Sequence, residues 1–299
     1  MTDVSAVIER VAARLASVGG VSAVVLGGSR ARGTHHVESD IDLGIYYHAD
    51  HPLDVDALTT LAHELDDRGT PDAATAPGEW GPWINGGAWL QIDGYRMDWL
   101  YREIELVSQV IAQCRAGRAT CDYQPGHPHG FHNHIYMAEA HHCRIVHDPT
   151  DTIAAFKSAT AEYPPLLQRA LIELHLWEAE FALFVASKAV SQRDHAYVAG
   201  NLFRCVACLV QVVFALNREY FLNEKGSVRL ADTFPLRPTR LAETVQSVMA
   251  NPGHDAPALQ ASIEQLTAVV TEVKDMCAAP LRDLPQIGER PPRRTSGRR

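Results

Sequence analysis

The sequence predicts an α+β protein: a small mixed β-sheet with flanking helices, followed by an all-α helical bundle. Short apolar runs alternate with glycine turns in the first half, whereas long apolar stripes at helical spacing fill the second half. Proline at Asp148-Pro149 ends any regular element, so we expect a first domain over residues 1–148 and a helical domain over 149–285. The basic, proline-containing tail over 286–299 is expected to be disordered.

Helical spacing of apolar residues in the first half predicts a helix over 4–18, which Gly19 and Gly20 end. Strands are expected over 21–26 and 39–45, followed by a helix over 53–65 and a loop over 70–87. Asp93-Gly94 is a turn signal between two strand-like runs, 89–92 and 95–101. A helix over 103–116 should follow, and the irregular, histidine-rich segment 121–149 is interpreted as a connector.

The second half predicts helices over 165–191, 194–223, 238–250 and 258–279. In the first of them an apolar stripe is expected to lie in the core; it contains Leu167, Leu171, Leu174, Trp177, Phe181, Phe184 and Val185. Cys205 and Cys208 fall within an apolar helical run without a second cysteine pair. We therefore interpret them as ordinary buried thiols.

Composition limits the classes of partner. The chain has 299 residues, of which 46% are apolar and 21% charged, enough for two domains with cores. Its net charge of -9 argues against a nucleic-acid partner and favours a small, cationic one. The N-terminus lacks the pattern of a secretory signal and no run of about 18 apolar residues occurs, so a cytoplasmic protein without a membrane partner is expected. The oligomeric state is not indicated.

Two aspartates are the most informative residues. Asp40 and Asp42 alternate with apolar residues in a strand, so their carboxylates share one face and repel each other unless a cation lies between them. A small-residue turn, Gly27-Gly28-Ser29, ends the preceding strand. The combination is suited to metal-dependent binding of a nucleoside triphosphate.

Gly-Gly-Ser, about ten residues, then Ser-Asp-Ile-Asp-Leu resembles the signature of the DNA polymerase β-type nucleotidyltransferase superfamily, which includes aminoglycoside and lincosamide nucleotidyltransferases. The resemblance implies a third carboxylate on a neighbouring strand, for which Asp98 is the best match. It implies two Mg²⁺ ions bound by Asp40, Asp42 and Asp98, with ATP or another nucleoside triphosphate as co-substrate. Asp98 would also orient or deprotonate the acceptor.

The resemblance also suggests which residues contact the triphosphate. Gly28 and Ser29 would offer backbone N–H groups and a hydroxyl to the β- and γ-phosphates. Arg30 and Arg32 either clamp the triphosphate or are surface charges. Lys225 is either a phosphate contact or a cation that favours the end of a helix.

The acceptor site is less well indicated. Glu79, Trp80 and Trp83 form an aromatic and acidic loop that could bind an amino sugar by stacking and charge, although two tryptophans beside a proline also pack a loop. The histidines between His127 and His142 lack the spacing of a known metal site.

These expectations lead to one main hypothesis. The protein would transfer a nucleoside monophosphate, AMP from ATP, to a hydroxyl of a small, aminoglycoside-like molecule and release pyrophosphate. Two alternatives stay open: a protein-AMPylating enzyme of antitoxin type, which the large second domain disfavours, and a non-catalytic module that senses nucleotides or binds a partner. Transfer to RNA ends is disfavoured because no basic track is present.

Overall fold

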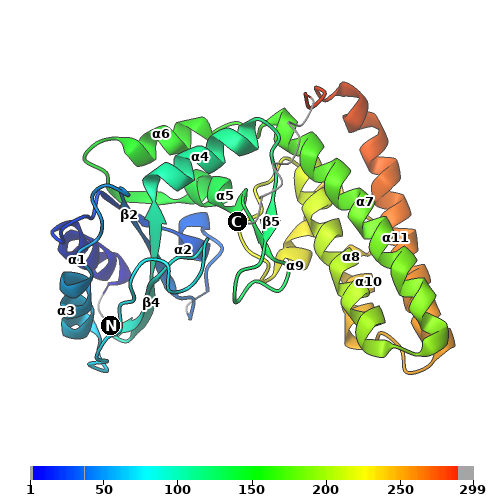
Figure 1. Ribbon diagram of the computed structural model, residues 1–299, viewed down its shortest axis with the longest axis horizontal. Helices are drawn as coiled ribbons and strands as arrows, with labels where there is room; N and C mark the ends of the chain where they lie inside the picture. The colour runs from blue at the N-terminus through cyan, green and yellow to red at the C-terminus, as the bar shows by residue number, and fades with distance from the viewer. Residues whose placement is uncertain (1–2, 37, 289–299) are drawn as a thin grey trace, which may run out of the picture. The chain divides into compact units, whose positions relative to one another are not determined.

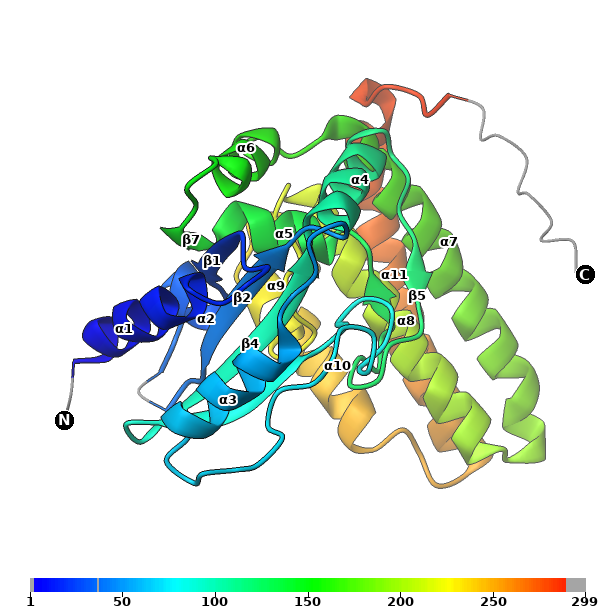
Figure 2. The same cartoon turned by 60° about the vertical axis from the view of Figure 1, so that its left-hand side comes forward.

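A computed structural model describes residues 3–36 and 38–288 (Figures 1 and 2). The chain divides into two compact units. The first comprises the described residues up to Gln113, together with Thr120–Glu162 and Tyr220–Glu224. The second comprises Cys114–Ala119, Tyr163–Glu219 and the described residues from Lys225 onward. The α+β class predicted from the sequence is confirmed. Most of the predicted basic tail, 289–299, lies outside the described residues.

The first unit is built on a mixed five-stranded sheet with the order β3-β4-β2-β1-β7. Its strands β2 and β4 pair in parallel, and the other neighbours are antiparallel. The strands are β1 (Ala23–Leu26), β2 (Ile41–Tyr47), β3 (Gly87–Ile92), β4 (Tyr95–Glu103) and β7 (Arg144–His147). Since β2 and β4 are adjacent, the strand with the paired acids lies beside the strand with Asp98.

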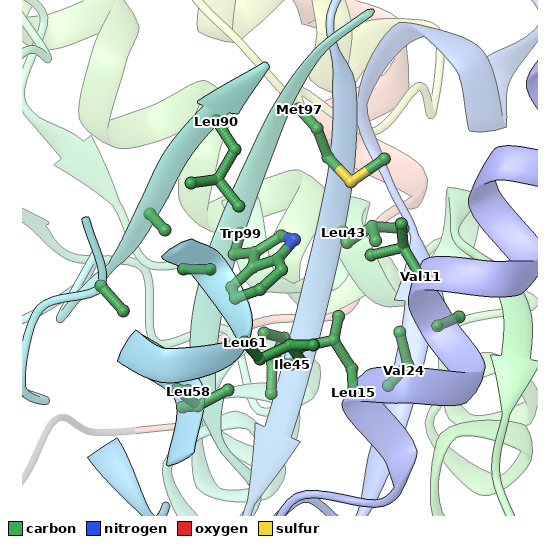
Figure 3. Close-up of a cluster of buried hydrophobic side chains, with 14 of the residues drawn as sticks. Val11, Leu15, Val24, Leu43, Ile45, Leu58, Leu61, Leu90, Met97 and Trp99 are labelled. Atoms are coloured by element: carbon green, nitrogen blue, oxygen red, sulfur yellow. The ribbon is translucent and has the colours of Figure 1, made fainter. Parts of the chain in front are cut away.

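Helices α1 (Val4–Ala16) and α3 (Val55–Leu65) bury their apolar sides against the sheet. Figure 3 shows Leu43 and Trp99 pointing into this core, where they meet Val11 of α1 and Leu61 of α3. Leu43 and Trp99 are fully buried and alternate with the aspartates along their strands. The alternation that directs these apolar side chains inward therefore directs the acids to the opposite face.

The histidine-rich segment is not the irregular connector that the sequence predicts. It contains β5 (Cys121–Asp122), β6 (Phe131–His132), α5 (Ile135–His142) and the edge strand β7, which pairs with β1. Most of α5 is buried, so it lacks the polar face on which recognition of a helix from its periodicity depends. The remaining helices of the first unit are α2 (Gly28–Arg32), α4 (Ile104–Arg115) and α6 (Thr152–Ala159).

The second unit is helical, as predicted. It contains α7 (Pro165–Ala189), a 3₁₀ turn η1 (Val190–Gln192), α8 (His195–Leu216), α9 (Ser227–Ala231), α10 (Leu241–Ala250) and α11 (Ala256–Asp283). Within the described residues, α8 alone is long and apolar enough to cross a membrane. However, 72% of its most apolar window is buried inside the structure, as in the core helix of a globular protein. Cys205 and Cys208 are buried, free thiols on α8.

Two predictions for these helices are wrong in detail. Helix α8 ends at Leu216 instead of continuing to Asn223, since Arg218 adopts a left-handed conformation (φ 56°). The aromatic part of the predicted core stripe on α7 is exposed: Trp177 is 60% accessible, Phe181 47% and Phe184 54%. Helix α7 buries its alanine-rich stripe instead, including Ala179, Ala182 and Ala186, because small side chains let helices approach closely.

Candidate active site

Three residues form a row across neighbouring strands of the sheet. Trp89 of β3 is the register partner of Asp98 of β4, and Asp98 is the register partner of Asp42 of β2. Side chains of directly paired residues point to the same face. The backbone N–H of Gly27 donates to the Asp42 carbonyl at 2.8 Å, so the turn after β1 adjoins the same row. The sheet thus brings two acids, an aromatic ring and the glycine turn together.

The glycine turn is shaped around the carboxylate of Asp42. Gly28 has φ of 59°, and a Cβ at this residue would lie 1.8 Å from Oδ2 of Asp42. Any other residue would overlap the carboxylate, so only glycine lets the backbone approach it. Ser29 follows directly on α2 and is half-buried. Gly28 therefore lies against Asp42, one of the acids with which the sequence analysis grouped it, and Ser29 follows it in the chain.

Asp40 lies two residues before Asp42 and is paired with an arginine that the sequence analysis did not select. Nε of Arg96 donates to the Asp40 carboxylate, and Nη2 of Arg96 donates to the Glu38 carbonyl at 2.7 Å. Both side chains are largely exposed, 67% for Arg96 and 41% for Asp40. A signal was available, since Arg96 and Asp98 are separated by one residue on the same strand and share a face.

Asp98 carries an unusual charge balance. Burial, followed by the negative charges of Asp42 and Asp40, raises its pKa to about 6, while Arg96 opposes the rise. Like charges crowded at one edge disfavour ionisation unless a cation neutralises them. Carboxylate oxygens are the hard donors that Mg²⁺ prefers, and it binds through a few carboxylates together with phosphate and water. The donor set and its mutual repulsion fit a divalent cation.

The two predicted arginines have different surroundings. Arg30 donates from Nε to the Asp40 carbonyl at 3.2 Å and from Nη2 to the Ser39 carbonyl at 2.8 Å. Its guanidinium therefore holds the backbone that leads into β2. Arg32 is half-buried near His142, whose pKa falls to about 4 because of burial and, secondly, the charge of Arg32. The structure thus places Arg30 against the segment that contains Asp40.

The aromatic loop divides into two parts. Trp80 stacks on Trp89 with ring centroids 4.2 Å apart and an interplanar angle of 13°. Trp83 packs against Phe131, with centroids 5.2 Å apart, and its carbonyl accepts a hydrogen bond from the Tyr136 hydroxyl at 2.6 Å. Trp80 is therefore brought to the row that contains Asp98, whereas Trp83 is part of a packed aromatic cluster.

Trp89 was missed by the sequence analysis, although its location followed from the hairpin. A two-residue turn at Asp93-Gly94 pairs Ile92 with Tyr95, and continuing this register pairs Trp89 with Asp98. Its side chain is 62% exposed. Glu79 is exposed, and its charge adds to burial in raising the pKa of Tyr101.

Two further sets of residues belong to the second unit. Lys225 lies in the second unit, where it is exposed in the turn before α9. Within the described part of the chain, one group of metal-type ligands has its ligand atoms within 4.8 Å of one another, and it consists of His175, Glu178 and Cys208 in the second unit. In that group a carboxylate oxygen of Glu178 also accepts from Nε of Arg204 at 2.6 Å.

A match to a family model supports a catalytic assignment for the first unit. A family model described as nucleotidyltransferase domain matches residues 7–110, and one described as domain of unknown function (DUF4037) matches residues 132–225. No curated protein matches the chain. Among solved structures, that of a nucleotidyltransferase-like protein from Exiguobacterium sibiricum 255-15 is similar at 6% identity and a TM-score of 0.44, covering 93% of this chain and 81% of its own. The first match includes Asp40, Asp42 and Asp98.

Proposed function

We propose that this chain, a nucleotidyltransferase of the DNA polymerase β-type superfamily, transfers AMP from ATP to a hydroxyl of a small, cationic, aminoglycoside-like molecule and releases pyrophosphate. The superfamily and the enzyme class are confirmed by the match over residues 7–110. The observation that carries the proposal is the pairing of Asp42 with Asp98 in adjacent parallel strands, two residues after Asp40 and beside the glycine turn. We expect this reaction to occur in the cytoplasm.

The three aspartates would hold two Mg²⁺ ions. Bound there, the ions would supply positive charge to the triphosphate and to the oxygens on which charge develops during transfer. The fit rests on the carboxylate donors, on the burial and the like-charge repulsion that raise the pKa of Asp98, and on Gly28, whose missing side chain leaves the Asp42 carboxylate accessible.

The residues of the chain have separate tasks in this scheme. The acceptor hydroxyl forms a bond to the α-phosphorus, the bond from that phosphorus to the pyrophosphate oxygen breaks, and Asp98 accepts the hydroxyl proton. Backbone N–H groups at Gly28 and Ser29 would contact the phosphates, with Arg32 as a further phosphate ligand. Arg30 would act by holding the segment that contains Asp40.

The acceptor site is proposed at the tryptophan pair beside Asp98. Trp80 and Trp89 present stacked rings on the face where Asp98 and Asp42 lie. Aromatic rings bind the apolar face of a sugar and attract cationic groups. Glu79 and the net charge of -9 favour an amino-substituted acceptor. Trp83 would support this loop through its packing on Phe131.

The test is a screen for pyrophosphate release. The full-length protein is incubated with Mg²⁺, each α-labelled nucleoside triphosphate and a panel of amino sugars, and labelled products are separated. Asp42→Asn should abolish release, whereas Asp50→Asn, at an exposed loop residue, should not. Turnover by Asp42→Asn near the wild-type rate would contradict the proposed site. Label on a protein band would identify a protein acceptor instead, and nucleotide binding without any transfer would indicate a sensor.

A further inference from the structure

The exposed face of α7 is aromatic where the surface of a soluble helix is usually polar. Trp177, Phe181 and Phe184 are each about half exposed or more, with Glu173 before them and Lys188 after them, both also exposed. Helix surfaces that face water ordinarily carry charged and polar residues. Contiguous exposed apolar patches mark interaction sites. We call these five residues the aromatic seam.

The seam is one continuous surface. The rings of Trp177 and Phe181 stack with centroids 5.3 Å apart and planes 6° apart, and the centroids of Phe181 and Phe184 are 6.3 Å apart. Nζ of Lys188 lies 4.1 Å from the ring centroid of Phe184. The successive spacings of four, four, three and four residues keep all five within a stripe roughly 80° wide at 3.6 residues per turn. A stripe of this kind fits the side of another helix.

The order of residues along the seam is self-complementary. The centre of the seam lies between Glu180 and Phe181. Glu173 and Lys188 are equally far from this centre along the chain, on opposite sides of it. Trp177 and Phe184 are likewise equidistant from that centre. A second α7 placed antiparallel across a two-fold axis at the centre would therefore set each Glu173 opposite a Lys188 and each Trp177 opposite a Phe184. A two-fold interface needs such complementarity of one surface to itself.

We propose that the aromatic seam is the interface through which two copies of this chain form an antiparallel, two-fold dimer. The charges at the two ends of the seam favour a second copy of the chain as the binding partner. An antiparallel copy places its own Lys188 opposite Glu173 and its own Glu173 opposite Lys188. A groove between α7 and α11, lined by Leu183, Phe184, Ile263 and Val270 among others, adjoins the seam and extends its apolar area. A helix pair of this size buries less than about 1,200 Å², so the dimer should be of micromolar affinity.

The experiment measures the oligomeric state of the full-length protein by sedimentation velocity and light scattering over about two decades of concentration around the micromolar range. The wild type should form dimers with rising concentration. Lys188→Glu and Glu173→Lys should each raise the dimer dissociation constant about tenfold, because symmetry converts two attractive contacts into two repulsive ones. The double variant Glu173→Lys with Lys188→Glu restores both attractive contacts and should return the dissociation constant to near the wild-type value.

Controls separate the interface from the fold. Glu9→Lys makes the same charge change on an exposed residue of α1 and should leave the dissociation constant unchanged. Phe181→Glu, next to the two-fold axis, should abolish the dimer, and circular dichroism should show each variant folded. Glu173→Lys also removes the ion pair of Glu173 with Arg169, so Lys188→Glu and Phe181→Glu decide the question if that variant unfolds. A wild type that stays monomeric, a dimer insensitive to Lys188→Glu and Phe181→Glu, or a double variant as weak as the single ones would overturn the proposal.

Discussion

Replacing Asp98 with asparagine should stabilise the protein in the absence of divalent cations while removing activity. The pKa of Asp98 rises from 3.8 to about 6, so above pH 6 the folded state must keep a carboxylate ionised against burial and against Asp42 and Asp40. A rise of the pKa from 3.8 to about 6 corresponds to roughly 3 kcal/mol, which we reduce to roughly 1–2 kcal/mol because solvent screens a half-buried group. Asparagine keeps the side-chain size without the charge.

The pH dependence has a definite sign. Below pH 3.8 the carboxyl is protonated in the folded and the unfolded state, so the wild type and the Asp98→Asn variant should be equally stable. As pH rises from 3.8 to 6, the unfolded state ionises first and the wild type loses stability that the variant retains. At pH 8 in chelator the melting temperature of Asp98→Asn should be about 3–6 °C higher.

Calorimetric or fluorescence melting curves at pH 4 and pH 8, with chelator or with Mg²⁺, check this reasoning. Mg²⁺ should stabilise the wild type more than the variant, so the difference at pH 8 should shrink or reverse. Asp122→Asn, an exposed aspartate of β5, is the matched control. A variant that melts below the wild type at pH 8 in chelator, or a difference that is the same at both pH values, would refute the crowding of acids on which the proposed metal site rests.

Three other substitutions test separate parts of the structure. Arg96→Gln should lower the dissociation constant for Mn²⁺, measured by calorimetry without nucleotide, roughly two- to fivefold, because the Asp40 carboxylate is no longer paired with the guanidinium. An unchanged dissociation constant would mean that this ion pair does not compete with the metal. Trp89→Ala should raise the steady-state KM for the acceptor about tenfold with little change in kcat, since the Trp89 ring stacks on Trp80 beside the acids. An unaltered KM would contradict a role of the two tryptophans in acceptor binding. Arg169→Ala should lower the free energy of unfolding, measured by urea titration, by roughly 3 kcal/mol, because the Arg169 guanidinium donates to backbone carbonyls at the end of α11. A loss below about 1 kcal/mol would show that these hydrogen bonds are dispensable.

The sequence was sufficient for those parts of the site that depend on strand periodicity. Asp40 and Asp42 share a face because side chains alternate in a strand. Asp98 was selected as the best match to the third carboxylate that the family resemblance implies, on a hairpin that a two-residue turn defines. The same register would have located Trp89. Local patterns do not give the neighbour of each strand, since the parallel pairing of β2 with β4 joins segments separated by a helix and a long loop. Only the family resemblance implied that Asp98 lies on a strand next to the paired acids.

Other predictions failed where tertiary contacts decide between local alternatives. Helix α7 has two apolar stripes, and nothing local determines that the alanine-rich one is buried and that Trp177 and Phe184 are left exposed. Helix α5 is buried on most sides and so has no periodic signal. Lys225 was expected at the end of a helix, yet α8 ends at Leu216, because a single left-handed residue, Arg218, is not foreseeable from its type.

The core beneath the acids explains how the fold tolerates their repulsion. Met97 and Trp99 flank Asp98 on β4 and are fully buried, as are Ile41 and Leu43 on either side of Asp42. A slip of one residue in either strand would expose these side chains and bury the carboxylates. Burial of one large apolar side chain contributes about 1.5–3 kcal/mol, so four of them outweigh the cost of crowding the aspartates. The acids are therefore held together by the packing on the other face of the same strands. Trp99→Ala should weaken metal binding at the proposed site, although the Trp99 side chain lies in the core and not beside the acids.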